Sequence, residues 1–399
     1  MTEDIRALLA EAAALYRDSP RAATVLRECL DRIGEPVQVG FTGADGTGKS
    51  TLAAALGEWP TRALRELTLV DDPSPAAHVD ATVRLVRHLE PDELAGVRPV
   101  GGSAFARQSA VNVVLVLSRA DEVSAGRIDA LLTAKQLARR SWREDPLCTG
   151  FQGVIAVAGQ LAYAGRALQD DEFGALTALA SVPRETLERH LLSVDSFVAE
   201  PFPVQLPPDA RRLLLTRFGL YGVRLATTLI RTGCENRIKL SADLVRRSGL
   251  GELRDTIAGC FVARADALKA RTALLRLEAL LQAEPRPHSD RLAARVERVA
   301  AAAHDVAELR LIADIRGGRT ALAEPVAEEA VRLLGAQGGF PADRLGLEPE
   351  SEDDEIYAAG LVAVQRWRHE AERPDAAPAE RAAARVVVRS AEGVLALFD

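Results

Sequence analysis

The segment with the clearest chemistry is GADGTGKST, residues 43–51, which follows the apolar run VQVGF and opens a run rich in alanine and leucine. Glycines at this spacing let successive backbone N–H groups turn toward an anion, and a following helix adds its positive end. In such a loop the lysine reaches the outer phosphates of a nucleotide and the next hydroxyl ligates Mg²⁺. We therefore predict a phosphate-binding P-loop made of Gly43, Asp45, Gly46, Thr47, Gly48, Lys49, Ser50 and Thr51.

Lysine is rare in this chain, which strengthens the assignment. Only four of the 50 cationic residues are lysines, namely Lys49, Lys135, Lys239 and Lys269. Arginine is otherwise the default cation, so a flexible ammonium group at the key position of the loop indicates a chemical requirement rather than a surface charge.

The elements that must position this loop follow from the pattern of apolar runs. VQVGF, LTLV, VNVVLVL and GVIAVA are each short enough to be buried strands, and helical segments separate them. Strands that alternate with helices predict a parallel sheet. LTLV leads into Asp71, VNVVLVL into Ser118-Arg119-Ala120-Asp121, and GVIAVA into Ala158-Gly159.

Composition sets the wider organisation. With 399 residues the chain exceeds one ordinary core, and 48% hydrophobic but only 4% aromatic residues favour helices rich in alanine and leucine. After the proline-rich segment 201–209 the sequence reads as helix almost to its end. We predict a helix-rich protein in which an α/β P-loop NTPase domain is joined to an α-helical bundle. The expected parts are N-terminal helices (1–35) that join the bundle, the P-loop domain (36–205) and the C-terminal bundle (206–399).

Charge and cysteine usage exclude several classes of protein. The net charge of −7 gives no reason to expect nucleic acid as a partner. Four cysteines stand far apart without metal-ligand spacing, which fits a reducing cytoplasm.

The N-terminus lacks the pattern of a signal peptide. The most apolar stretch, residues 213–230, contains Arg217 and Arg224, so we expect no membrane-spanning helix.

The residues after the strands point to a guanine nucleotide. Ser118-Arg119-Ala120-Asp121 resembles the guanine-specificity motif, in which an aspartate pairs with the N1 and N2 hydrogens of guanine and a cationic stem lies over the base. Asp71 stands where nucleotide switch proteins hold Mg²⁺ through water. Ala158-Gly159 stands where GTPases place a backbone N–H near the guanine O6.

Together with LVDDPS, RLVRHLEPDE, RFGLYGVRLAT and the terminal segment QRWRHEAERPDAAPAERAAARVVVRSAEGVLA, these motifs resemble the actinobacterial dynamin-like proteins, the dynamin-superfamily GTPases that include the isoniazid-inducible group. The resemblance covers most of the chain. It implies GTP or GDP and Mg²⁺ as ligands, with Ser50 and Asp71 at the metal. It also implies self-association or a paralogous dynamin-like partner, and a cytoplasmic protein in peripheral contact with the inner face of the cell membrane.

Several positions depart from the pattern of that family. Asp45 and Gly46 stand where dynamin-like enzymes commonly have glutamine and serine, and Ser74 replaces the switch glycine. The switch loop is nearly absent, and Thr61 and Thr68 are the threonines nearest to its expected place. A carboxylate beside the γ-phosphate opposes the electrostatic stabilisation that phosphoryl transfer needs. We therefore expect slow or absent GTP hydrolysis and assign no catalytic residue.

Two other functions stay open. GADGTGKST also resembles the loop of thymidylate kinases, so the protein could be a nucleoside or nucleotide kinase, although no lid signature precedes Ser118. Alternatively, the nucleotide site is vestigial and the helices form a scaffold for partner helices. Guanine selectivity, phosphoryl transfer to a nucleoside and absence of any binding distinguish the three functions.

Overall fold

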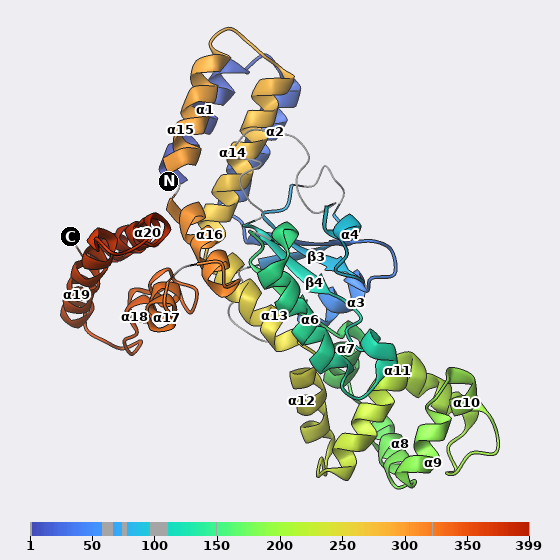
Figure 1. The fold of residues 1–399 in the computed structure, drawn as a ribbon. Helices are drawn as coiled ribbons and strands as arrows, with labels where there is room; N and C mark the ends of the chain where they lie inside the picture. Colours follow the sequence, from blue (N-terminus) through green and yellow to red (C-terminus); the bar gives the residue numbers. More distant parts are fainter. Residues whose placement is uncertain are drawn as a thin grey trace.

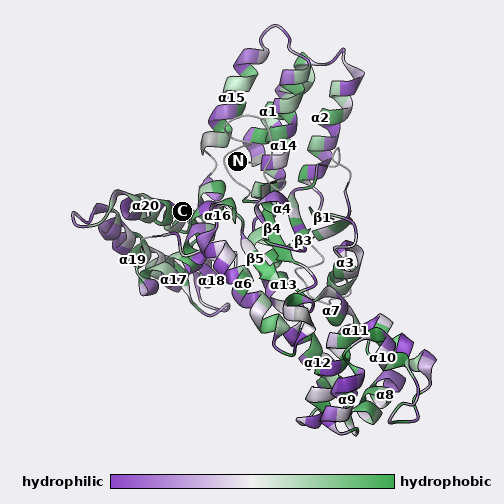
Figure 2. Cartoon of the chain, turned by 45° about the vertical axis from the view of Figure 1, so that its right-hand side comes forward, coloured by the Kyte–Doolittle hydropathy of each residue, from purple (hydrophilic) through white to green (hydrophobic). Residues whose placement is uncertain are grey.

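The computed structural model describes residues 2–57, 67–73, 78–95, 111–148, 150–302, 304–320 and 322–398. A small α/β body lies at the centre, and three helical parts extend from it in different directions (Figure 1). Colouring by hydropathy shows apolar residues concentrated in the strands, whereas most helices carry both kinds of residue (Figure 2).

The central sheet consists of parallel strands in the order β2-β1-β3-β4-β5, which confirms the predicted parallel α/β arrangement. The four predicted apolar runs all form strands. The sequence analysis does not predict β3, because Thr82 and Arg84 interrupt its apolar residues. The strands are β1 (Val37–Gly43), β2 (Leu67–Asp71), β3 (Ala81–Val86), β4 (Val113–Leu117) and β5 (Gly153–Ala156).

The strand order creates a crevice at the carboxyl end of β1. The chain leaves β1 to form β2 on one side and then returns to place β3 on the other side. In open α/β sheets, ligands bind at such reversals of strand order. The loop that follows β1 is the glycine-rich segment, so the topology places it at this crevice.

Both faces of the sheet are covered by helices. Alternate residues of β4 divide between the two cores: Val113 and Leu115 face one of them, and Val114 and Val116 face the other. The second core is closed by α3 (Lys49–Gly57), α13 (Leu250–Ile257) and the π-helical turn η4 (Ala258–Val262). The first core continues into the lower helical part of Figure 1. The short and long helices on this side are α4 (Pro91–Ala95), η2 (Val123–Gly126), α6 (Ala130–Glu144), η3 (Pro146–Cys148), α7 (Gly159–Arg166), α8 (Asp170–Ala180), α9 (Arg184–His190), α10 (Val194–Val198), α11 (Pro208–Arg231) and α12 (Arg237–Arg247).

The first core crosses the proposed boundary between residues 205 and 206. Leu214 and Phe218 of α11 and Leu240 of α12 belong to the same buried cluster as the strand residues Leu115 and Val154. The boundary remains a proposal, and the helices that follow it pack on the α/β body.

A second helical part joins the two regions of the chain. Helices α1 (Thr2–Leu15) and α2 (Pro20–Ile33) pack with α14 (Ala265–Ala283) and α15 (Ser289–Ala302) around a separate apolar core. Ser19 ends the connection between α1 and α2, and its hydroxyl accepts the Ala22 N–H at 3.3 Å, which caps the start of α2.

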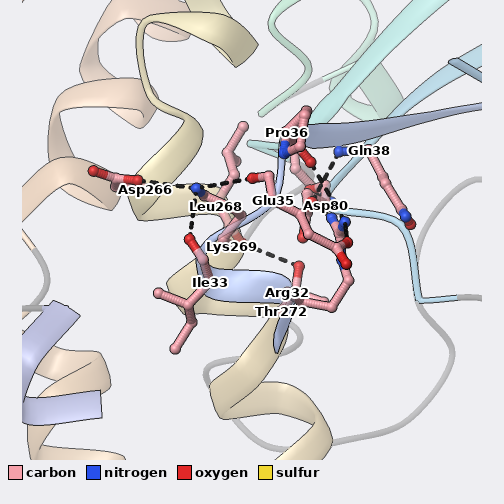
Figure 3. A network of polar contacts seen from close by, with 11 residues as sticks. Arg32, Ile33, Glu35, Pro36, Gln38, Asp80, Asp266, Leu268, Lys269 and Thr272 are labelled. Carbon is pink, nitrogen blue, oxygen red and sulfur yellow. Dashed lines mark hydrogen bonds and ion pairs between the residues drawn. The ribbon is translucent and has the colours of Figure 1, made fainter. Parts of the chain in front are cut away.

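A polar network fastens this bundle to the sheet (Figure 3). The Arg32 guanidinium of α2 pairs with Asp80, which is 1% exposed and also accepts the Gln38 N–H at 2.9 Å. The Lys269 ammonium of α14 donates to the carbonyls of Ile33 and Glu35 at 2.9 and 3.2 Å. The link between α2 and β1 is therefore held from both sides.

The C-terminal part forms a further apolar core around the buried Trp367. Helix α16 connects it to the sheet, because Leu309 faces the sheet core and Ile312 faces the C-terminal core. Its helices are α16 (His304–Arg316), α17 (Glu324–Leu333), α18 (Pro341–Leu345), α19 (Asp353–Glu372) and α20 (Pro378–Leu395).

Candidate functional site

The loop between β1 and α3 requires glycine at its first position. A Cβ atom on Gly43 would lie 2.6 Å from the Leu85 carbonyl oxygen, too close for any other residue. Gly48, just before α3, has φ +87°, in the left-handed region. The Thr47 hydroxyl donates to the Ala44 carbonyl at 2.8 Å and braces the loop. These contacts fix the backbone conformation of the loop, and its N–H groups lie beside the start of α3.

Lys49 is partly satisfied within this loop. Its ammonium donates to the Gly43 carbonyl at 2.8 Å, and it lies 3.7 Å from the Asp45 carboxylate and 3.5 Å from that of Asp72. The side chain is only 10% exposed. An ammonium has three donors, so two of them face longer contacts that an incoming anion can replace.

The segment after β4 folds back onto the glycine loop. The Ser118 hydroxyl donates to the Val86 carbonyl at 2.9 Å, which fixes the exit from the strand. Arg119 has φ +50°, and its Nε donates to the Gly46 carbonyl at 3.0 Å. Its guanidinium also pairs with Glu122 at 2.6 Å. The arginine stem thus bridges two of the predicted motifs.

A pocket of about 350 Å³ lies between these two segments and two helices. Gly159, Gln160 and Tyr163 of α7 form one side, and Thr216 and Arg217 of α11 form another. The Gln160 amide donates to the Thr216 carbonyl at 2.7 Å, so the two helices are tied together at the pocket.

Asp121 and Glu122 are the acidic residues in the pocket lining, and Glu122 already pairs with Arg119. Burial raises the pKa of the Asp121 carboxyl above the usual aspartate value. Nearby, burial raises the pKa of Tyr221 to about 12, and the charge of Asp121 adds to this shift. A half-buried carboxylate in a pocket is a strong acceptor for a ligand that presents N–H donors.

The structure brings most of the predicted base-site residues together. The predicted loop residues that lie outside the pocket lining are Gly43, Asp45, Gly46, Lys49 and Ser50. Ala158 is also outside, because its N–H donates to the Ser248 carbonyl at 2.9 Å. Predicted residues that line the pocket are Thr47, Gly48, Thr51, Ser118, Arg119, Asp121 and Gly159.

Asp72, rather than its neighbour Asp71, contacts Lys49 in this structure. Asp71 ends β2 opposite Phe41 and is exposed, and Ser50 is exposed at the start of α3. Within the described ranges no three His, Cys, Asp or Glu side chains gather in a way that could hold a metal ion. A magnesium ion here would need ligands from a bound nucleotide and water, which is its usual mode of binding.

Sequence reasoning missed the pocket residues that come from helices. Gln160 and Tyr163 follow Ala158-Gly159 directly, so their helical position is a signal that could have found them. Thr216 and Arg217 carry no local signal, because only the packing of α11 brings them to the pocket. Thr61 and Ser74, considered for the switch region, lie outside the described residues.

Helix α11 is long and apolar enough, by length and composition, to qualify as a candidate membrane span, and half of the qualifying window is buried in the structure. Phe218 and Tyr221, the aromatic residues on its apolar face, are 1% and 5% exposed and belong to the first core. Arg217 pairs with the buried Glu172 at 2.8 Å. In this structure the apolar face of α11 thus packs against protein.

Comparisons with known proteins identify relatives. The isoniazid-induced protein IniC of Mycobacterium tuberculosis strain CDC 1551 / Oshkosh is 36% identical over 362 residues, covering 86% of this chain and 73% of the relative. The protein of the same name from strain ATCC 25618 / H37Rv has the same identity and coverage. No family model matches the chain. No solved structure matches it. Because the identity extends over most of both sequences, the chain belongs to the family of the isoniazid-induced protein IniC.

Proposed function

We propose that this protein is a dynamin-like P-loop protein that binds guanine nucleotides, GTP or GDP with Mg²⁺, and hydrolyses GTP slowly or not at all. The observation that carries the proposal is the single pocket in which the ends of β1, β4 and β5 meet. It joins Thr47 and Gly48 to Asp121 and Gly159. The strand order and the glycine loop support phosphate binding at the same edge of the sheet.

The choice of base rests on Asp121. A carboxylate accepts two hydrogen bonds side by side, and the N1–H and 2-amino group of guanine present two such donors. Adenine has an acceptor at N1 and no 2-amino group, so it would leave the carboxylate without these bonds. Arg119 supports this role, because its bond to Gly46 places its stem between the glycine loop and the pocket.

Slow hydrolysis follows from the charges around Lys49. The carboxylates of Asp45 and Asp72 lie within 4 Å of the ammonium that would bind the outer phosphates. Two negative groups there partly cancel the charge of Lys49 and repel the γ-phosphate. Gly46 has no side chain that could orient a water molecule. These features favour a nucleotide-binding protein over an efficient hydrolase.

Two exposed residues at the ends of neighbouring elements, Ser50 and Asp71, suit a magnesium ion. Ser50 offers a hydroxyl, and Asp71 at the end of β2 offers a carboxylate, which are oxygen ligands of the kind Mg²⁺ prefers. When bound, the ion would offset the charge of the β- and γ-phosphates. The protein residues Lys49 and Ser50 would hold the phosphates beside α3, and the glycine loop would supply N–H groups.

We propose further, from the family resemblance, that the protein acts in the cytoplasm in assemblies at the inner face of the cell membrane. Either self-association or a paralogous dynamin-like protein would supply the second subunit. No role for nucleic acid is proposed, since the net charge of −7 gives no electrostatic reason to expect such a partner.

The test is a titration of the purified chain with fluorescent GDP, GTP and ATP analogues in the presence of Mg²⁺, together with phosphate release from GTP. Lys49→Ala removes the phosphate contact, and Lys135→Ala on α6, outside the pocket lining, is the matched control. Guanine-selective binding that depends on Lys49, with negligible turnover, supports the proposal. Selectivity for ATP would favour the kinase, and absence of binding would leave the helical scaffold.

A further inference from the structure

Strand β5 ends the sheet, and a groove of about 990 Å³ follows its free edge. Figure 2 shows β5 beside α6 and α13, which form the two walls. The floor consists of residues 153–155, and Arg316 and residues 336–338 also line the groove. We call this cleft the β5 groove. It shares no residue with the nucleotide pocket.

The backbone of β5 leaves hydrogen-bonding groups facing the groove. The Val157 N–H donates to the Leu117 carbonyl at 2.9 Å, in register with the pairing of Leu117 and Ala156. Because bonding alternates along a parallel strand, residues 153 and 155 face β4, and the N–H and C=O of Val154 face away from it. The hydrogen bonds among the described residues include none to these two outward groups outside the sheet.

Two side chains add unpartnered polar atoms to the same groove. Gln152 is 1% exposed; its Nε2 donates to the Leu309 carbonyl at 3.1 Å, and its Oε1 has no partner in the described part of the chain. The buried Nε1 of Trp142 likewise lacks an acceptor there. With Val154, the groove presents two donors and two acceptors. This mixture matches the amide groups of an extended peptide, whereas a simple anion would satisfy the donors alone.

The walls of the groove carry opposite charges. Arg139 and Arg143 are exposed one turn apart on α6, and neither has an ion pair or hydrogen bond with another residue that the structure describes. On the facing wall, α13 carries Glu252 and Asp255, of which Asp255 pairs with Arg254 at 2.8 Å. Arg246 of α12 also lines the groove, and it pairs with Asp243. Side chains of an extended strand point alternately to its two sides. A peptide in the groove would therefore turn one set of side chains to the arginines and the other to the acids.

We propose that the β5 groove binds an extended segment of a partner protein by strand addition, with acidic residues toward α6 and basic residues toward α13. The outward groups of Val154 supply main-chain bonds, and the charged walls select an alternating acidic and basic sequence. The Ser248-Gly249 turn covers the Ala156 end, because Gly249 lies against the Ala156 carbonyl, so the segment extends toward Gln152 and Arg316.

The test uses a short blocked peptide of alternating glutamate and lysine with a fluorophore, measured by anisotropy with the full chain. The control peptide has the same composition with all glutamates before all lysines. A third peptide carries N-methyl groups on alternate residues and cannot pair with the edge of a sheet. The protein variants are the double substitution Arg139→Glu with Arg143→Glu, and Arg140→Glu, whose native side chain instead pairs with Glu144 at 2.8 Å.

We expect the alternating peptide to bind the native chain at least about tenfold more tightly than either control peptide, with or without GDP. The double variant should lose this preference, and Arg140→Glu should keep it. Equal binding of the alternating and block peptides would overturn the proposal. The proposal would also be overturned if no peptide binds and the double variant self-associates more weakly than the native chain in sedimentation. That result would mean that the groove binds a second copy of the chain.

Discussion

Two lysines stand at opposite ends of β1 and are equally buried, but their surroundings differ. Both side chains are 10% exposed. Lys269 has three oxygen partners within 3.2 Å, namely the carbonyls of Ile33 and Glu35 and the carboxylate of Asp266. Lys49 has one such partner, the Gly43 carbonyl at 2.8 Å.

The difference separates a structural cation from a binding cation. An ammonium has three donors, and Lys269 uses all of them within the protein. Lys49 keeps two donors near carboxylates at 3.5 and 3.7 Å, longer than hydrogen bonds. Burial alone therefore does not distinguish the two roles, whereas the number of satisfied donors does.

Replacing each lysine by methionine gives the sharpest contrast, because the stem is kept and the charge is removed. We expect Lys49→Met to weaken GDP binding by about 1000-fold, close to 4 kcal/mol, with little change in stability. Lys269→Met should lower the free energy of unfolding by about 2 kcal/mol, since it leaves carbonyls unpaired, and should leave GDP binding nearly unchanged. Isothermal titration and urea denaturation check the two effects. An equal loss of GDP binding in both variants would contradict the distinction between a binding lysine and a structural lysine.

The junction beside Lys269 offers a second test of the structural role. Asp80→Ala removes the buried partner of Arg32, which keeps only its ion pair with the exposed Glu35 at 2.6 Å, and leaves the Gln38 N–H without its acceptor. We expect a loss of about 3 kcal/mol in the free energy of unfolding, as for a broken buried ion pair. Arg32→Ala in combination should add little, because the pair is already lost. A double-mutant cycle by urea denaturation measures the coupling; additive losses would contradict a direct pair.

The base pocket can be tested by exchanging one acceptor for a donor. Asp121→Asn replaces a carboxylate oxygen by an amide that faces the 2-position of the base. We expect GDP to bind about 30-fold more weakly, near 2 kcal/mol, and xanthosine diphosphate to bind more tightly than GDP, because xanthine carries a carbonyl at that position. Competition titrations against fluorescent GDP give both values. If the Asp121→Asn variant keeps its preference for GDP, the base binds somewhere other than beside Asp121.

The smallest expected effect concerns pH. Burial raises the pKa of Asp121, so this carboxyl takes up a proton at a higher pH than an ordinary aspartate. Pairing with guanine needs the ionised form, and GDP affinity should fall as the pH drops through that raised pKa and stay level above it. The stability of the free protein should change in the opposite direction. Its free energy of unfolding should rise as the pH falls through the raised pKa, because protonation removes the cost of the partly buried charge. A series of GDP titrations from neutral to mildly acidic pH checks this, with Asp121→Asn as the pH-independent control.

The sequence predicts the parallel α/β arrangement, because the alternation of short apolar runs with helical segments is a local pattern. It does not predict β3, whose buried residues alternate with Thr82 and Arg84. Nor does it predict that Thr216 and Arg217 reach the pocket. Their helix, α11, bends at Gly219, which has φ +66° and ψ 175°, and only tertiary packing decides which part of a bent helix meets α7.

The pair of contacts at the α2–β1 link has a mechanical consequence. A segment held at one point can rotate about that point. A segment held at two separated points instead transmits its rotation to the parts that hold it. Arg32 fastens the link to Asp80 beside the sheet, and Lys269 fastens it to α14. Helix α14 has 19 residues. At 1.5 Å per residue it spans ~28 Å, so a turn of about 10° at the link would sweep its far end through roughly 5 Å. A bundle held in this way would turn together with the link, and a small rotation there would become a larger displacement at its far end.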